Sequence, residues 1–158
     1  MSKKDLEIKV GLIIRKPEHE VFEAIVDPEK MKNYFIATST GRMEEGETLT
    51  WKFPEMELQF PVRIKKIIKD KFISYNWDDF DKTETLVEIT LTPKENKTTF
   101  VTVVEKSKPN NEEGIRWLKS NTEGWANFLC CMKAWLEFGV HLRKGAFDLS
   151  QMPEAVNK

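Results

Sequence analysis

The sequence predicts an α+β fold: a curved antiparallel β-sheet of six to seven strands that wraps around a long C-terminal helix, with two short helices after the first strand. Residues 38–106 read as a succession of strands with short polar turns, which favours antiparallel pairing. One continuous helical pattern then covers about residues 115–143. The length of 158 residues favours a single domain over 1–158, with a core of about 5–145 and a tail of about 146–158.

The N-terminal part predicts one strand and two short helices. Apolar residues alternate with other residues over 6–14, which is the period of a strand with one solvent-facing side. Pro17 followed by acidic residues is typical of a helix start, and an apolar stripe continues this helix to Val26. Asp27 then predicts an N-cap, with Pro28 in the first helical position of a second short helix.

The middle of the chain is predicted to form about six strands. Leu49, Trp51 and Phe53 alternate with polar residues, and a longer strand keeps one apolar parity over 58–68, broken only at Lys66. Turn-forming residues separate the further strands, which are predicted at 72–77, 87–91 and 98–105.

Two neighbouring apolar stripes run along the predicted long helix. The first holds Leu118, Thr122, Trp125, Leu129, Met132, Leu136 and Val140, and the second holds Trp117, Phe128, Cys131, Trp135, Phe138 and Leu142. Together they cover a wider arc than the roughly 100° of an ordinary surface helix. Such a helix needs a large concave partner, and an antiparallel sheet that wraps a helix tends to leave space between the two.

Two motifs resemble a known family. The stretch from Val21 to Lys30 resembles the "VfeAltDPekl" start of the START-like (SRPBCC, helix-grip) superfamily. Gly124-Trp125, followed by Leu129, Met132 and Leu136-Glu137, resembles the "GW…L..L…LE" signature of its activator of heat-shock-protein-90 ATPase homologue-like branch. The resemblance implies a helix-grip fold with a cavity between sheet and helix. Such cavities hold apolar ligands in the superfamily, some members are catalytic, and the eukaryotic namesake is a co-chaperone domain.

The predicted ligand cavity combines residues of the long helix with residues of the sheet and the second short helix. Its members are Trp125, Leu129, Met132, Leu136, Trp51, Tyr75, Trp77 and Phe35. Aromatic walls with few polar groups are typical of apolar binding sites, although each ring would equally serve core packing. Trp125 is the first candidate, because the neighbouring Gly124 lacks a side chain and would let the helix approach the sheet.

Acid–base catalysis would need a polar group inside this cavity. The candidates are Tyr34, Arg63, Tyr75, Asn76, Asp78 and Glu105. Tyr75 shares the parity of Trp77 and is the one that we expect to point inward, unless its hydroxyl reaches the surface; Arg63 is expected to face water. The acidic residues are expected at helix starts, turns and the solvent-facing sides of strands. We therefore predict no catalytic residue.

Metal, cofactor and nucleic-acid binding are not expected. His19 and His141 share no ligand-like spacing with Cys130 and Cys131, and His141 is expected in the last turn of the long helix. Cys131 is expected to be a small buried apolar residue. The net charge of −1 gives no long-range attraction to nucleic acid. The chain shows neither an apolar run of membrane-spanning length nor the apolar core of a secretory signal, so a reducing, cytoplasmic location is expected.

The function predicted from these observations is binding of an apolar or amphipathic small molecule in the cavity. A co-chaperone-like module that binds a heat-shock ATPase is the first alternative, and it would need an exposed docking face. A cyclase- or hydratase-type enzyme is the second alternative, and it would need inward polar residues such as Tyr75 and Asn76.

Overall fold

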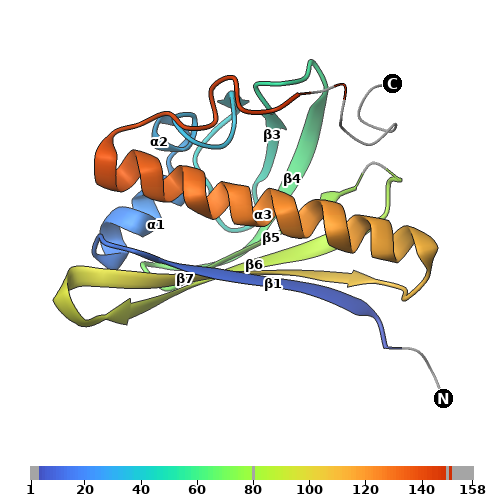
Figure 1. Ribbon diagram of the computed structural model, residues 1–158, viewed down its shortest axis with the longest axis horizontal. Coiled ribbons are helices and arrows are strands. Elements are labelled where there is room, and N and C mark those ends of the chain that lie inside the picture. The colour runs from blue at the N-terminus through green and yellow to red at the C-terminus, as the bar shows by residue number, and fades with distance from the viewer. Residues whose placement is uncertain (1–3, 80, 149, 151–158) are drawn as a thin grey trace.

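The computed structural model describes residues 4–79, 81–148 and 150, and these form one curved antiparallel sheet with a long helix lying across it (Figure 1). The elements in chain order are β1 (Leu6–Ile14), α1 (Glu18–Val26), α2 (Pro28–Met31), β2 (Thr38–Ser39), β3 (Thr48–Lys52), β4 (Gln59–Ile68), β5 (Phe72–Asp78), β6 (Glu84–Lys94), a 3-10 turn (Glu95–Lys97), β7 (Thr98–Lys108) and α3 (Glu112–Phe138). The predicted α+β helix-grip class is confirmed. Of the predicted tail, residues 149 and 151–158 lie outside the described residues.

The described strands form a seven-stranded sheet in the order β1-β7-β6-β5-β4-β3-β2. Each strand from β2 to β7 pairs with its neighbour in sequence, and β1 returns to pair with β7, for example Val10 with Val103. The two-residue period then places alternate residues of β7 on the buried face, among them Val101, Val103 and Glu105.

α3 starts earlier and ends earlier than the apolar pattern predicts. The side chain of Asn111 accepts a hydrogen bond from the Gly114 backbone N–H at 2.8 Å and caps the helix, which begins at Glu112, three residues before the predicted start. At the other end, Gly139 adopts a left-handed conformation (φ 67°), which terminates the helix at Phe138. The prediction that His141 lies in the last helical turn is therefore wrong, because the apolar period continues past the glycine that stops the helix.

α3 lies against β1 and β7 at one side of the sheet, while β3 and β4 rise on its far side (Figure 1). After Gly139 the chain reverses and runs back along α3, as Figure 1 shows. We call residues 139–148 the C-terminal strap.

Glu137 connects the end of α3 to Arg15, the residue that directly follows β1. Its carboxylate accepts hydrogen bonds from the Arg15 backbone N–H at 2.9 Å, from Arg15 Nε at 2.6 Å and from Lys133 Nζ at 2.6 Å. The Glu137 side chain is 3% exposed. Burial alone would raise the pKa of Glu137, but the hydrogen bonds from Arg15 and Lys133 outweigh it and lower the pKa to about 2.

We expect Glu137→Gln to lower the melting temperature at neutral pH and to lose this effect in acid. Since the folded-state pKa lies below the ordinary value of 4.5, the carboxylate stabilises the fold fully above that value. This contribution is lost as the pH falls from about 4.5 towards 2. Thermal unfolding of both proteins from pH 7 to 2, with the exposed Glu123→Gln as control, measures the difference. A difference that stays constant over this range would contradict the assignment.

Candidate functional site

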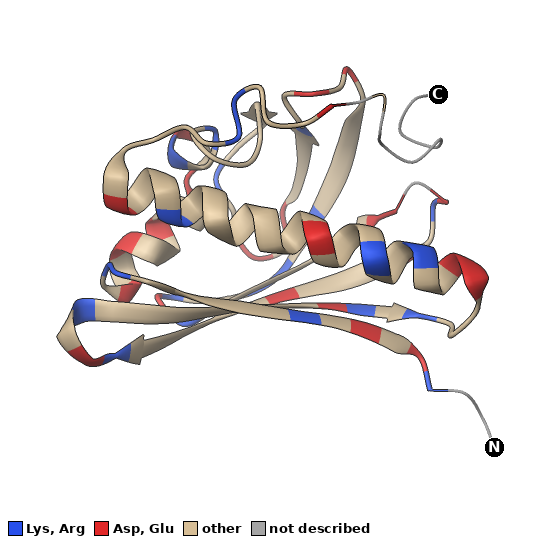
Figure 2. Ribbon diagram, in the orientation of Figure 1, with Lys and Arg blue, Asp and Glu red and all other residues tan. Residues whose placement is uncertain are grey.

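A cleft of about 820 Å³ opens beside α3. Its walls come from α3, from the segment after α2, from the segment between β3 and β4 together with the start of β4, from the end of β5 with the following loop, and from the C-terminal strap. The middle of α3, residues 124–132, carries no charged side chain, and Figure 2 shows this stretch between the charged ends of the helix. The helix therefore presents an uncharged stretch beside the cleft.

Five aromatic rings that line the cleft contact one another in a closed circle. Trp77 lies 5.6 Å from Trp125, Trp125 6.0 Å from Phe35, and Phe35 5.2 Å from Phe53, measured between ring centroids. Phe53 lies 5.1 Å from Phe60, and Phe60 returns to Trp77 at 6.1 Å. We call these five residues the aromatic collar. They come from β4, β5, α3, the segment after α2 and the segment after β3, so tertiary folding is needed to assemble them.

A buried carboxylate lies next to the aromatic collar. Glu105 of β7 is 0% exposed, and its Oε1 accepts hydrogen bonds from Trp125 Nε1 at 2.8 Å and from Asn121 Nδ2 at 3.1 Å. Its Oε2 accepts from Trp77 Nε1 at 2.9 Å and from Thr85 Oγ1 at 2.6 Å. All four donors are neutral. Glu105 thereby fixes the orientation of two rings of the collar, one on α3 and one on β5.

The position of Glu105 corrects the expectation that acidic residues occupy only solvent-facing places. Glu105 lies two residues after Val103 and therefore on the same, buried face of β7. This alternation is visible in the sequence and could have predicted its burial. Its charge also reaches Tyr75: burial raises the pKa of Tyr75 well above its ordinary value, and the Glu105 carboxylate adds to the rise. Tyr75 is therefore an inward, neutral phenol, and the alternative of a surface-reaching hydroxyl does not hold.

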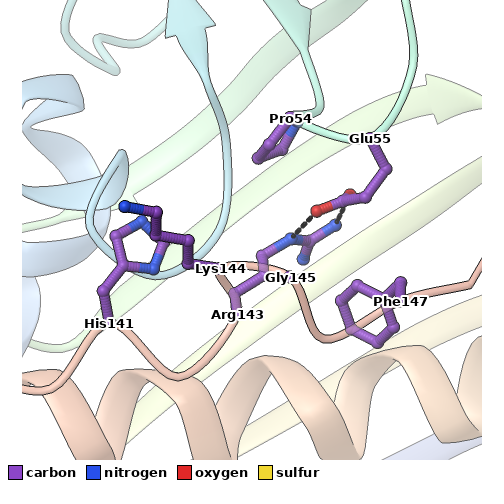
Figure 3. A pocket seen from close by; sticks show the side chains of 7 residues that line it. All are labelled: Pro54, Glu55, His141, Arg143, Lys144, Gly145 and Phe147. Carbon is purple, nitrogen blue, oxygen red and sulfur yellow. Dashed lines mark hydrogen bonds and ion pairs between the residues drawn. The ribbon is translucent and has the colours of Figure 1, made fainter.

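The C-terminal strap is held over the cleft by Arg143 (Figure 3). The guanidinium donates to both oxygens of Glu55, from Nε at 3.0 Å and from Nη2 at 2.6 Å. It also lies over the rings of Phe53 and Phe147, at 5.1 and 4.8 Å from their centroids. The same ion pair also lines a second pocket of about 570 Å³, drawn in Figure 3, which includes His141 and Lys144.

The structure brings three of the eight predicted cavity residues to the cleft. Trp125, Trp77 and Phe35 line it as members of the aromatic collar. The other five do not line it: Trp51, Tyr75, Leu129 and Met132 are buried in the core, and Leu136 is half-buried against the core. A role for any of the eight in ligand binding stays a prediction.

Leu129, Met132 and Leu136 do not line the cleft because a different side of α3 faces it. Besides Trp125 and the charged Glu123, the cleft side carries small and polar residues, namely Ser120, Asn121, Gly124 and Asn127. Gly124 lines open space, since a Cβ built there would meet nothing within 4 Å. The expectation that Gly124 lets the helix approach the sheet is therefore wrong. In the sequence, the small and polar residues around Trp125 are the signal from which the cleft side of α3 could have been predicted.

The remaining polar candidates have structural partners. The Tyr34 hydroxyl donates to the Ala24 carbonyl at 2.8 Å, and Asn76 Nδ2 donates to the Thr85 carbonyl at 3.4 Å. Arg63 is half-buried, not simply facing water, and it pairs with Asp78 and Glu84.

The described residues contain no group of three or more His, Cys, Asp or Glu side chains that could hold a metal ion. Both cysteines are free: Cys130 is exposed and Cys131 is buried, and burial raises the pKa of the Cys131 thiol. Within the part of the chain that the structure describes, no helix has the length and apolar character needed to cross a membrane.

A curved antiparallel sheet that grips one long helix, with a cleft at their junction, defines a helix-grip domain of the ligand-binding type. The family model described as "Activator of Hsp90 ATPase homolog 1-like protein" matches residues 15–137, and the chain belongs to this family. No match is found among the curated proteins.

Solved structures share this fold. Protein SSP2350 from Staphylococcus saprophyticus is 29% identical with a TM-score of 0.77, over 87% of this chain and 96% of that one. The Aha1 dimer from Colwellia psychrerythraea is 19% identical with a TM-score of 0.72, over 85% and 98%. DynU16, a putative protein in the dynemicin biosynthetic locus, is 21% identical with a TM-score of 0.76, over 86% of this chain but 49% of its own. The last two show the fold alone.

Proposed function

We propose that this protein binds an apolar or amphipathic small molecule in the cleft between the sheet and α3. The observation that carries the proposal is the aromatic collar, five contacting rings that all line one cleft. The cleft volume of about 820 Å³ falls within the range of about 300–1,000 Å³ typical of small-molecule sites. The rings supply a large apolar surface at low cost in side-chain entropy, because each has only two rotatable bonds.

We expect the neutral apolar dye N-phenyl-1-naphthylamine to bind with one site per chain and to gain fluorescence. Trp125→Ala should weaken this binding at least tenfold, because it removes the collar member that joins α3 to β5. Fluorescence titration of the folded proteins measures both effects. Trp135→Ala is the matched control: it removes a tryptophan from the same helix that stacks on Tyr34 and does not line the cleft. Equal dye binding by the wild type and Trp125→Ala would contradict the proposal.

A partner-binding role is the second candidate, and one surface favours it. Phe138, Val140 and Leu142, at the end of α3 and the start of the strap, are exposed apolar residues, and they would form the contact. A stable complex with a heat-shock ATPase on size-exclusion chromatography, together with failure to bind the dye, would favour this role over ligand binding.

We also propose that the protein acts in a reducing, cytoplasmic setting. The two adjacent free cysteines support this proposal, because an exposed thiol such as that of Cys130 oxidises readily elsewhere. Fractionation of the host cell that recovers the protein outside the cytoplasm would overturn it.

A further inference from the structure

The cleft carries an excess of negative charge. Among the described residues that line it, five are acidic, namely Glu55, Asp78, Asp79, Glu123 and Asp148, and two are basic, namely Lys82 and Arg143. Arg143 is already engaged in two hydrogen bonds with Glu55. Lys82 is then the remaining basic residue of the described lining, against four further acidic residues.

Cations just outside the cleft do not remove this excess. Arg63 pairs with Asp78 at 2.9 Å, but the same Nη2 also pairs with Glu84 at 3.1 Å. Lys108 pairs with Asp79 at 2.6 Å, but it also pairs with Asp81 at 2.9 Å. Arg63 and Lys108 each pair with two carboxylates. Each group of three charges therefore keeps a net negative charge.

Glu105 adds a further negative charge next to the aromatic collar. Its four hydrogen-bond donors are neutral, and none of the ion pairs within 4.0 Å among the described residues involves Glu105. Two of the donors are the indole N–H groups of Trp77 and Trp125. An indole that donates to a carboxylate gains electron density on its ring, and this strengthens the attraction of its face for a cation.

We infer that the ligand carries one positive charge on an apolar body, as a protonated amine or a quaternary ammonium group does. This inference rests on the proposed function, because it assigns the ligand class of the same cleft. The apolar body lies against the aromatic collar, and the cation lies near the rings of Trp77 and Trp125 and the carboxylates of the rim. A carboxylate or sulfonate ligand would instead meet uncompensated negative charge in a partly desolvated cleft.

Three ligands with the same naphthalene body test the inference by isothermal titration calorimetry. At pH 7, 1-naphthylmethylamine is a cation, 1-naphthalenemethanol is neutral and 1-naphthoic acid is an anion. The amine should bind at least tenfold more tightly than the alcohol, and the acid should bind least well. If the alcohol binds as tightly as the amine, or the acid more tightly, the ligand class is wrong while small-molecule binding stands. If none of the three binds, the inference and the proposed function both fail.

A variant tests whether the cleft carboxylates cause the preference. Glu123→Gln combined with Asp148→Asn neutralises two exposed rim carboxylates and should reduce the ratio of amine affinity to alcohol affinity at least threefold. The matched control, Glu7→Gln, removes one exposed carboxylate of β1 that does not line the cleft and should leave the ratio as it is. A ratio that the double variant leaves unchanged would overturn the inference.

Discussion

Replacing Glu105 with alanine is expected to lower the free energy of unfolding by about 3–5 kcal/mol, which is an exceptional loss for one substitution. The substitution leaves four donors without their acceptor: the indoles of Trp77 and Trp125, the Thr85 hydroxyl and the Asn121 amide. A buried donor without a partner costs about 1–3 kcal/mol. The total stays below the sum, because groups that border the cleft can bind water instead.

Urea denaturation of wild type and variant measures this loss. Glu88→Ala is the matched control, because Glu88 lies on neighbouring β6, is 28% exposed in its side chain and pairs with Lys106 at 2.9 Å. A partly exposed ion pair contributes about 0–1 kcal/mol, so the control should unfold nearly as the wild type does. A loss from Glu105→Ala as small as that of the control would show that the four donors find other partners.

Phe128→Ala should give the other large effect, a loss of about 3–5 kcal/mol. Phe128 is 1% exposed and joins three aromatic neighbours: its ring centroid lies 4.6 Å from that of Phe35, 5.2 Å from Trp125 and 5.6 Å from Tyr34. Removal of this ring leaves a cavity that rigid neighbours cannot fill.

Thermal and chemical denaturation of Phe128→Ala measure this loss. Phe138→Ala is the control on the same helix, because Phe138 is 64% exposed and should cost less than about 1 kcal/mol. Equal losses from the two substitutions would mean that the aromatic layer around Phe128 can collapse onto the vacated space.

The fold could be predicted because its signals are local. The alternation that predicts a strand over 6–14 corresponds to β1 as observed, and Asp27 caps α2 by accepting a hydrogen bond from the Glu29 backbone N–H at 2.9 Å. The C-terminal end of α3 was missed because Gly139 lies inside an apolar period that continues through Val140. Periodicity alone gives no weight to the left-handed conformation that ends the helix.

The candidate site could be predicted only in part, because it depends on contacts between distant segments. Apolar stripes reveal which face of α3 is buried, but they do not reveal that its cleft face consists of small and polar residues such as Asn121 and Gly124. The strap depends on Arg143 meeting Glu55, 88 positions away in sequence. Glu105 stood on the correct parity, but its donors come from three other elements, β5, β6 and α3.

The C-terminal strap contributes side chains to the cleft but none to the buried core. Four of its residues, Arg143, Ala146, Phe147 and Asp148, line the cleft, yet none of its described residues belongs to the buried core. Substitutions at Ala146 or Asp148 would alter one wall of the cleft without removing a side chain of the buried core. In an evolving lineage, this segment can therefore accumulate changes that redirect the choice of ligand while the rest of the chain stays under selection for stability.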